Sequence, residues 1–340
     1  MDRAALVKTG DEAFRKYLDK LGKVNLKTRS GDYQILTRDR AREVYRLLVE
    51  NAATHLRGVK FRSVTVPASG GADSTFMLKI LRDASDKIVN EGGPKVEIIG
   101  LTLPCKLQSD AEYYDDMGRW ACELYADDYA TINILPAHEM ILDSLLNLDA
   151  IQMQKSGKTA RSVFDRVSPK YAEREYKVDR GNAAARLRMI TAYGLSKMFS
   201  GAPCSTDNLS EKLTGFWTLC GDEGTFKYIQ NIWKGLEQPL IMHAAGIPTP
   251  FYTQTPTDGL GVGDGDVHQM YGRLHTGKED YIDVDIVLIN FMDGNPYPDP
   301  INPTVPSHEH PVCRLKVNTE FKRTPFSLSR VDLDLHAFPY

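Results

Sequence analysis

The stretch Val64-Thr65-Val66-Pro67-Ala68-Ser69-Gly70-Gly71-Ala72-Asp73-Ser74-Thr75 decides the fold, because a β-branched run ends here in a Ser-Gly-Gly-x-Asp-Ser turn. The run predicts a buried strand, and the apolar spacing over residues 75–81 predicts a helix directly after the turn. Gly70 and Gly71 let the backbone approach a ligand closely, while the hydroxyls of Ser69 and Ser74 and the free amides at the helix start offer donors to an anion. The stretch therefore predicts a strand, a phosphate-binding loop and a helix.

The acidic residue inside this loop indicates a metal ion. The loop has neither the Gly-Lys-Ser/Thr of the Walker type nor the Gly-x-Gly-x-x-Gly of dinucleotide-binding folds. A carboxylate among phosphate oxygens would repel them unless a divalent cation lies between, so Asp73 is predicted to bind magnesium. The pattern resembles the PP-loop of the ATP pyrophosphatases, enzymes that cleave ATP to AMP and pyrophosphate while they adenylate a substrate. The alternative is an ordinary Ser/Gly turn that caps a helix.

The composition sets broad limits on the class of protein. The chain has 340 residues, and its formal net charge of -3 does not indicate nucleic acid as a partner. No apolar run has membrane-spanning length and the charged start is unlike a signal peptide, so we expect a cytoplasmic protein without membrane contact. The cysteines are widely spaced and lack a Cys-x-x-Cys pair, which predicts reduced, packed thiols rather than disulfides or a zinc site. They are Cys105, Cys122, Cys204, Cys220 and Cys313.

Three segments are predicted along the chain. Residues 1–58 have helical spacing of apolar residues and are assigned to packing and dimer contacts. Residues 59–282 contain the strand, loop and helix described above and two further strands, at 96–104 and 128–134, which together indicate βαβ units and a parallel sheet. Residues 283–340 form a C-terminal extension whose proline-rich part, 287–311, is expected to be extended and rich in turns.

Further predictions concern the middle of the chain. The polar segment 152–178 is expected to be a loop, either a surface excursion or a lid over a substrate. Gly181 is expected to begin a helix, and Asp207 to cap the next one. The core face of the first helix is predicted to contain Leu187, Ile190, Gly194, Leu195 and Met198.

Ordered blocks of sequence beyond the loop resemble the ammonia-dependent NAD synthetases, in the family's order from about residue 60 to 326. The blocks are Gly181-Asn182, Ala185-Arg186-Leu187-Arg188-Met189, Thr206-Asp207, Glu211, Thr214-Gly215-Phe216, Thr218, Gly221-Asp222, Pro256-Thr257 and Thr319-Glu320-Phe321-Lys322-Arg323 with Pro325. The resemblance implies a doubly wound α/β fold, in which helices flank a parallel sheet and the PP-loop lies at the carboxyl end of the first strand.

The resemblance also implies an activity and a set of site residues. The carboxylate of deamido-NAD would attack the α-phosphate of ATP, pyrophosphate would leave, and ammonia would displace AMP from the acyl adenylate, so that positioning and charge stabilisation dominate. The catalytic residues would be Asp73, Glu211 and Lys234, of which Asp73 and Glu211 would bind Mg²⁺. ATP would be bound by Ser69, Gly70, Gly71, Asp73, Ser74, Thr206, Lys234 and Thr257, and the dinucleotide by Arg186, Asp222 and Lys322.

Each of these residues also has an ordinary structural interpretation. Glu211 and Arg186 are types that usually lie in solvent on helix surfaces, and Lys234 matches the family only after a one-residue gap. Thr257 lies in a Thr-Pro-Thr-Asp-Gly stretch, where its hydroxyl could serve only a turn.

Three positions depart from the family pattern on the dinucleotide side. Leu219, Phe226 and Phe321 stand where the family has Lys, Asp and His, and each lost buried hydrogen bond is typically worth about 1 kcal/mol. The favoured hypothesis is an NAD synthetase in which neighbouring residues supply the missing contacts. An enzyme that adenylates and amidates a different carboxylate is the second hypothesis. A non-catalytic nucleotide-binding protein is the third, and the two predicted metal-binding carboxylates argue against it.

The resemblance further implies a homodimer, with the dinucleotide near the interface. Ammonia would be the nitrogen source, although a separate glutaminase remains possible as a partner. His308 and His310 lie in the proline-rich stretch without a third ligand type nearby, which does not indicate a metal site.

Overall fold

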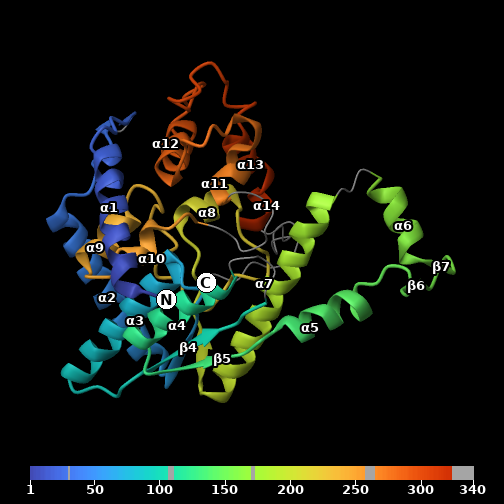
Figure 1. Cartoon of the computed structure of the whole chain (residues 1–340), viewed down its shortest axis with the longest axis horizontal. Helices are drawn as coiled ribbons and strands as arrows, with labels where there is room; N and C mark the ends of the chain where they lie inside the picture. Colours follow the sequence, from blue (N-terminus) through green and yellow to red (C-terminus); the bar gives the residue numbers. More distant parts are fainter. Residues whose placement is uncertain (30, 106–110, 170–172, 257–264, 324–340) are drawn as a thin grey trace, which may run out of the picture.

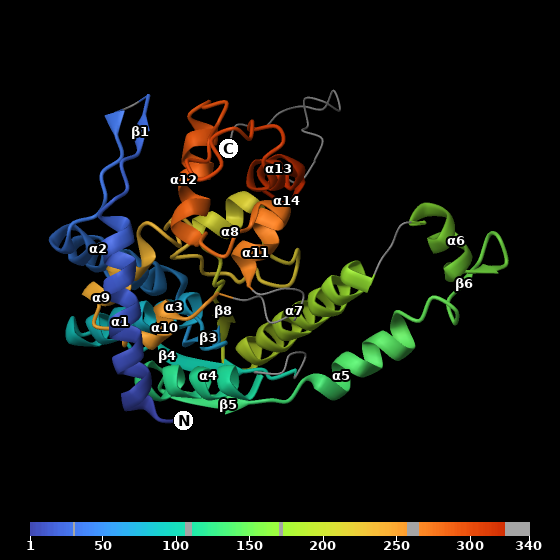
Figure 2. The same cartoon turned by 45° about the horizontal axis from the view of Figure 1, so that its top comes forward.

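A four-stranded sheet forms the centre of the computed structural model, which describes residues 1–29, 31–105, 111–169, 173–256 and 265–323. Its strands lie in the order β5-β4-β3-β8, and each neighbouring pair is parallel (β5 and β4 are labelled in Figure 1, all four in Figure 2). They are β3 (Ser63–Pro67), β4 (Glu97–Thr102), β5 (Asp128–Thr131) and β8 (Gly201–Pro203). The predicted α/β class with a parallel sheet is confirmed.

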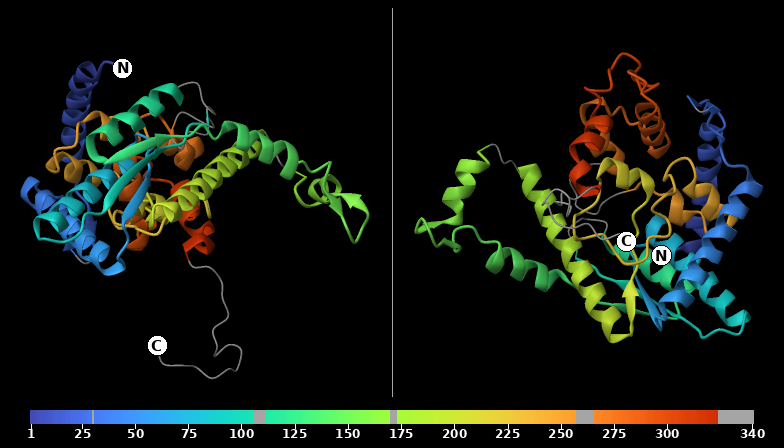
Figure 3. Two further views of the ribbon diagram at one scale, coloured as in Figure 1. Left: turned by 90° about the horizontal axis from the view of Figure 1, so that it is seen from below. Right: turned by 180° about the vertical axis from the view of Figure 1, so that it is seen from behind.

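Helices cover both faces of this sheet. α3 (Ala72–Asn90) and α4 (Ala111–Tyr125) pack on each other and on β4, while α7 (Glu173–Met198) packs on β3 and β8 from the other side (Figure 3). Right-handed crossovers explain this, because the chain moves from β3 to β4 to β5 in one direction and then returns through α7 to β8. The strand order therefore reverses beside β3, and such a switch point places a ligand crevice at the carboxyl ends of the strands.

The N-terminal segment is mainly helical, as predicted. α1 (Arg3–Leu21) packs on α10 (Pro250–Thr253), and α2 (Arg38–Val59) packs on α3 and α9 (Gln238–Ala244). A short hairpin of β1 (Lys27–Thr28) and β2 (Gly31–Asp32), which the sequence analysis did not predict, joins the two long helices.

An arm projects from the body between β5 and α7 (Figure 2). It contains α5 (Leu135–Met140), a π-helical turn (Ile141–Leu145), a hairpin of β6 (Gln152–Met153) and β7 (Lys158–Thr159), and α6 (Ala160–Val167). The prediction of a loop over residues 152–178 is wrong, since this range holds β6, β7, α6 and the start of α7. No residue of α6 is buried, although Val163, Phe164 and Val167 recur at helical spacing, a short signal within a mainly polar segment.

Helix α7 differs from its prediction in its start and in its core face. It begins at Glu173, eight residues before Gly181, which lies inside it. Ile190 and Met198 are 65% and 80% exposed and Gly194 is exposed as well, so the predicted core face is wrong at these three positions. The face that is buried carries mostly small residues, which allow the helix to approach β3 and β8 closely: Ala183, Ala184, Leu187, Met189, Ala192 and Ser196.

The C-terminal part adds short helices above the carboxyl ends of the strands. They are α8 (Leu209–Thr214), α11 (Asp266–Tyr271) with a 3-10 turn (Gly272–Leu274), α12 (Tyr281–Met292), α13 (Pro311–Asn318) and α14 (Glu320–Arg323). α12 crosses the predicted boundary at residue 283 and makes residues 287–292 helical rather than extended, because the prolines of this stretch begin only at Pro296. His310 is buried, with its Nε2 2.9 Å from Oδ2 of Asp299, so the histidine packs in a structural pair.

The cysteines and the membrane prediction can be compared directly with the structure. All five thiols are free, as predicted, and Cys105, Cys122, Cys204 and Cys313 are buried. Cys220 departs from the prediction, because it is exposed and its backbone has a φ of 62°. Within the described ranges, no helix has the length and apolar character needed to cross a membrane.

Candidate active site

The loop between β3 and α3 has the backbone that its glycines predicted. Gly70 has a φ of 80°, and a Cβ there would lie 2.5 Å from the amide nitrogen of Gly118 and from Cβ of Met117. The Gly70 carbonyl accepts a hydrogen bond of 2.9 Å from Nε2 of Gln254, which fixes the loop from the opposite side. Gly71 then caps α3 with extended backbone, so the first amides of that helix remain available to an anion.

Replacing Gly70 with Ala is expected to destabilise the fold by about 2 kcal/mol, because left-handed strain adds to a clash with α4 backbone. ATP binding should weaken as well, since the loop must move. Urea unfolding and ATP titration measure both effects. Gly58→Ala on α2 is the matched control, because open space surrounds Gly58 and Ala favours a helix. An unchanged unfolding midpoint for Gly70→Ala would contradict the prediction.

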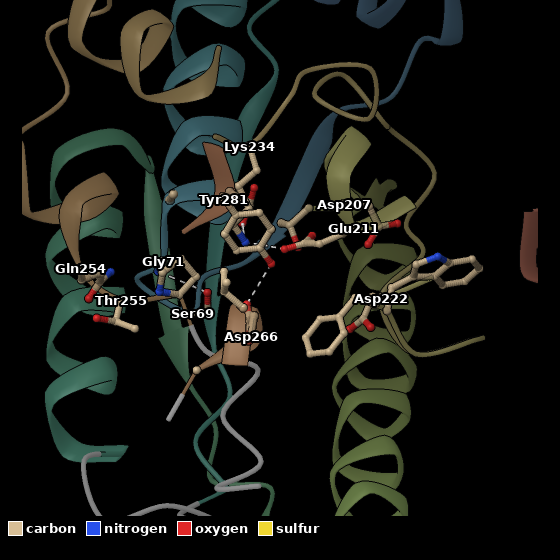
Figure 4. Close-up of a pocket in the computed structure, with 18 of the residues that line it drawn as sticks. Ser69, Gly71, Asp207, Glu211, Asp222, Lys234, Gln254, Thr255, Asp266 and Tyr281 are labelled. Atoms are coloured by element: carbon tan, nitrogen blue, oxygen red, sulfur yellow. Dashed lines mark hydrogen bonds and ion pairs between the residues drawn. The ribbon is translucent and has the colours of Figure 1, made fainter. Parts of the chain in front are cut away.

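Three predicted catalytic side chains meet beside this loop. Nζ of Lys234 lies 3.1 Å from Oδ2 of Asp73 and forms an ion pair with Glu211 (Figure 4). The same Nζ lies 4.7 Å above the ring of Tyr281, which donates a hydrogen bond of 3.2 Å to Oδ2 of Asp266. The three elements that carry the catalytic residues are distant in sequence, namely α3, α8 and the segment before α9. We call Asp73, Glu211 and Lys234 the acid–lysine cluster.

Burial controls the charge of the acid–lysine cluster. It raises the pKa of Glu211 above the usual range, against the opposing effect of the Lys234 charge. Burial alone would lower the pKa of Lys234. The negative charges of Asp73 and Glu211 more than offset this effect, so the pKa of Lys234 is raised. Two carboxylates thus share one ammonium in a weakly solvated site. A divalent cation would be attracted to them more strongly than the single positive charge of Lys234, because the Coulomb energy rises with charge.

The cluster fits Mg²⁺ in the chemistry of its donors. Mg²⁺ keeps several waters and is commonly held by one or two carboxylates together with substrate phosphates. Asp73 and Glu211 supply two carboxylates next to the loop that would hold the phosphates. Over the described ranges, no group of three or more His, Cys, Asp or Glu residues could form a site made by the protein alone.

A buried carboxylate of α12 holds the segment that carries Lys234. Oδ2 of Asp285 accepts hydrogen bonds from the amides of Gly235 and Leu236, at 2.8 and 3.0 Å. The amide of Lys234 donates to Oγ of Ser210 at 3.0 Å, which ties the segment to α8. The position of Lys234 therefore depends on a residue 51 positions later in the chain, and no local pattern could have indicated it.

A cavity of about 1050 Å³ joins the acid–lysine cluster to the remaining predicted site. Of the predicted residues, those that line it are Ser69, Gly71, Asp73, Thr206, Glu211, Asp222, Lys234 and Lys322. Gly70 and Ser74 support the loop from beneath, and Ser74 is buried with its Oγ 3.1 Å from Oγ of Ser69. Thr257 lies outside the described residues. Arg186 is exposed, and its Nε donates to the carbonyl of Leu219 at 3.2 Å, so it does not line the cavity of the single chain.

Comparison with known proteins agrees with this geometry. The family model described as NAD synthase matches residues 44–325. The chain belongs to the NAD synthase family. A relative named NH3-dependent NAD+ synthetase, from Pectobacterium atrosepticum, is 30% identical over 229 residues, which cover 65% of this chain and 72% of the relative.

Two solved structures share the fold of this NAD synthase family member. One is described as an NMN synthetase from Francisella tularensis, with a TM-score of 0.60 and 20% identity, and covers 85% of this chain and 98% of that one. The other is described as an NAD+ synthetase from Burkholderia pseudomallei, with a TM-score of 0.56 and 21% identity. It covers 84% of this chain and 91% of that one. The doubly wound architecture with flanking helices is thus the architecture of the family.

The three departures from the NAD synthase pattern lie away from the cavity of the single chain. Phe226 is fully buried, with its ring 5.8 Å from the ring of Phe61 and 5.9 Å from that of Tyr228. Leu219 and Phe321 are 39% and 62% exposed, and neither contributes to the cavity wall. The prediction that these residues alter an acceptor pocket therefore finds no support within one chain.

The part of the cavity that Asp207, Asp222 and Lys322 line is called the acceptor side below, and it has its own buried charges. Burial raises the pKa of Asp207 to about 7, and the charge of Asp222 adds to this effect. Asp207 does not cap α8 as predicted, because its Oδ2 accepts from Oγ of Ser205 at 2.9 Å and Asn208 takes the capping position. Nζ of Lys322 donates to the carbonyls of Gly215 and Trp217, so α14 closes this end of the cavity.

Asn208, which no sequence pattern indicated, connects the Asp73 carboxylate to the backbone of Glu211. Its Nδ2 donates to Oδ1 of Asp73 at 3.0 Å, while its Oδ1 accepts from the amide of Glu211 at 3.0 Å. Nε2 of Gln238 also donates to Oδ1 of Asp73, at 3.1 Å. One amide side chain thus fixes the carboxylate of α3 relative to the start of α8.

Replacing Asn208 with Ala is expected to weaken divalent-cation binding about 10-fold, because groups that orient metal ligands typically contribute that much or more. Titration with Mn²⁺, followed by electron paramagnetic resonance, measures the affinity. Asn51→Ala, which removes an exposed amide on α2 that donates to the carbonyl of Leu47, should leave it unchanged. Equal Mn²⁺ affinity in wild type and Asn208→Ala would exclude this role.

Proposed function

We propose that this chain catalyses the Mg²⁺- and ATP-dependent amidation of deamido-NAD by ammonia. One carboxylate oxygen of deamido-NAD attacks the α-phosphorus of ATP, the bond to the β-phosphate breaks, and pyrophosphate leaves. Ammonia then attacks the acyl carbon of the adenylate, loses a proton and displaces AMP, which leaves NAD. The observation that carries the proposal is the acid–lysine cluster, which lies beside the phosphate-binding loop in the wall of one cavity, in a member of the NAD synthase family.

The residues of the chain would contribute mainly position and charge. The amides at the start of α3 and the hydroxyl of Ser69 would hold the β- and γ-phosphates. Asp73 and Glu211 would hold Mg²⁺, which neutralises negative charge on the departing pyrophosphate when bound. Lys234, displaced from the two carboxylates by the metal, would bind phosphate oxygens instead.

The acceptor would lie at the end of the cavity away from the phosphate-binding loop. Asp222 and Lys322, which resemblance to the family assigns to the dinucleotide, line the cavity there. An enzyme for a different carboxylate was suggested by Leu219, Phe226 and Phe321, and it finds no support within one chain, because none of them lines its cavity.

A homodimer is part of the proposal. Ile190, Tyr193 and Met198 of α7 are 65%, 45% and 80% exposed, which leaves large apolar side chains on this helix for a second copy to cover. Light scattering after size exclusion measures the molar mass. A mass of two chains supports the proposal, and a mass of one chain at micromolar concentration contradicts it.

The activity is tested by measuring AMP and pyrophosphate with Mg-ATP and ammonium, in the presence and absence of deamido-NAD, with NAD identified by mass. We expect all three products only when deamido-NAD is present. A parallel series replaces deamido-NAD with nicotinate mononucleotide, and ammonium with glutamine. If only nicotinate mononucleotide is turned over, it is the substrate and deamido-NAD is not. If ATP binds but no acid causes AMP release, the chain is a nucleotide-binding protein without this activity.

A further inference from the structure

The face of α7 that borders the cavity carries one charge. The cavity-lining residues of the helix recur at helical spacing: Val178, Gly181, Asn182, Ala185, Arg188 and Met189. Of these described residues, Arg188 alone is charged. Arg186 lies two positions earlier, which turns its side chain to the outer surface.

The guanidinium of Arg188 is anchored at one nitrogen. Its Nε donates a hydrogen bond of 3.2 Å to the carbonyl of Leu103, just beyond the carboxyl end of β4. Among the described residues, neither terminal nitrogen forms a hydrogen bond or an ion pair, although Asp222 and Asp115 influence the charge from a greater distance. Burial lowers the pKa of Arg188, because a charged guanidinium is poorly solvated there and lacks an ion-pair partner among the described residues.

The anchor places Arg188 close to the phosphate-binding loop. The carbonyl of Leu101, two residues before Leu103, accepts a hydrogen bond of 2.8 Å from the amide of Ala68, where the loop begins. The Asp222 carboxyl that influences Arg188 belongs to the acceptor side of the cavity. Arg188 thus lies between the loop, which would hold the phosphates, and the acceptor side.

We infer that Arg188 binds a pair of oxyanion oxygens at the point where the two substrates react, through its two terminal nitrogens. A planar guanidinium fixed at Nε presents two parallel donors, which match a carboxylate or a phosphate. Two groups carry such oxygens at this point, namely the carboxylate of the acceptor and the α-phosphate of ATP. Adenylation forms a bond between these two groups. This inference rests on the proposed function, because it takes the acceptor to be a carboxylate that reacts with ATP.

The inference gives Arg188 a binding role in addition to the one that resemblance to the family implies for Arg186. It also gives Arg188 a role in the rate. Negative charge increases on the oxygens of the α-phosphorus as the carboxylate attacks, and a fixed guanidinium would stabilise that charge more than the ground state.

The test compares Arg188→Lys and Arg188→Met with wild type, using the full chain. ATP affinity is measured by calorimetry without acceptor, and the kcat and KM for deamido-NAD are measured with saturating Mg-ATP. We expect Arg188→Met to lower kcat/KM about 100-fold or more. We expect Arg188→Lys, which keeps the charge but not the paired donors, to lower it at least 10-fold. Lys197→Met, on the exposed face of the same helix, is the matched control and should stay within 2-fold of wild type.

The pattern of losses identifies the oxyanion. A higher KM for deamido-NAD with unchanged ATP affinity assigns Arg188 to the acceptor carboxylate, and weaker ATP binding assigns it to the α-phosphate. Both results support the inference. The inference would be overturned if the ATP affinity and the kcat and KM for deamido-NAD all stayed within 3-fold of wild type in a variant with unchanged circular dichroism.

A rescue experiment separates binding from a role in folding. Arg188→Ala should regain activity in a saturable way when methylguanidinium is added, because the ion can occupy the vacated place and contact the substrate. A structural role predicts a lower melting temperature without rescue, and that outcome also overturns the inference. If wild type makes no NAD, the proposed function fails instead, and the ATP-binding arm still tests the contact with the α-phosphate.

Discussion

Replacing Asp73 with Asn is expected to lower the kcat for NAD formation about 1,000-fold. The amide keeps the volume of the carboxylate and can still accept at Oδ1 from Asn208 and Gln238, so the fold should remain. The charge that would hold Mg²⁺ against the phosphates is lost, and groups that stabilise developing charge typically contribute 100- to 1,000-fold each. Turnover measured over a Mg²⁺ titration should show both a lower maximum and a higher midpoint.

A second carboxylate on the same helix provides the control for this experiment. Asp86 of α3 is 54% exposed at its side chain and lies 3.3 Å from Arg82, remote from the cavity. Asp86→Asn should keep turnover within 2-fold of wild type, since exposed ion pairs contribute little. If Asp73→Asn retained more than a tenth of the wild-type kcat, a metal-binding role for Asp73 would be wrong.

Replacing Lys234 with Met is expected to destabilise the metal-free protein by about 3 kcal/mol. Removal of the ammonium leaves Asp73 and Glu211 in a poorly solvated place without a compensating charge, and breaking a buried pair in this way typically costs about 3 to 5 kcal/mol. Mg²⁺ should restore most of this loss in the variant, because it supplies the missing positive charge to the same two carboxylates. In wild type the ion must first displace Lys234, so its effect on stability should be smaller.

Urea unfolding with and without saturating Mg²⁺ measures this difference. Lys87→Met, which removes an exposed partner of Glu91 at the end of α3, is the control and should respond to Mg²⁺ as wild type does. A variant at position 234 that is as unstable with Mg²⁺ as without it would show that the cluster does not accept the ion.

The sequence predicted the parts of the site that local patterns encode. The strand, the loop and the start of α3 follow from twelve consecutive residues, so the position of Asp73 was predictable from them. Glu211 and Lys234 were indicated only by resemblance to a family, and the geometry that joins them depends on Asp285 and Asn208, whose contacts span much of the chain. No spacing rule brings such residues together, because tertiary packing determines their distances.

Helix faces were less predictable than helices. In α7 the pattern of large apolar residues suggested a core face with Ile190 and Met198, while the sheet is contacted through alanines. The cavity-facing stripe could not be derived without the true orientation of the helix, and for this reason Arg188 was not singled out. Two positions correspond to a rotation of about 200°, which moves a side chain to the opposite side of the helix.

The exposure of Cys220 gives the protein a single site for chemical labelling. The other four thiols are buried, and burial raises the pKa of each of them, so they react slowly with alkylating reagents at neutral pH. A maleimide dye added in equal amount should therefore attach at Cys220, two residues before Asp222 on the acceptor side. A fluorophore there would sense the entry of the acceptor in real time, without any engineered cysteine.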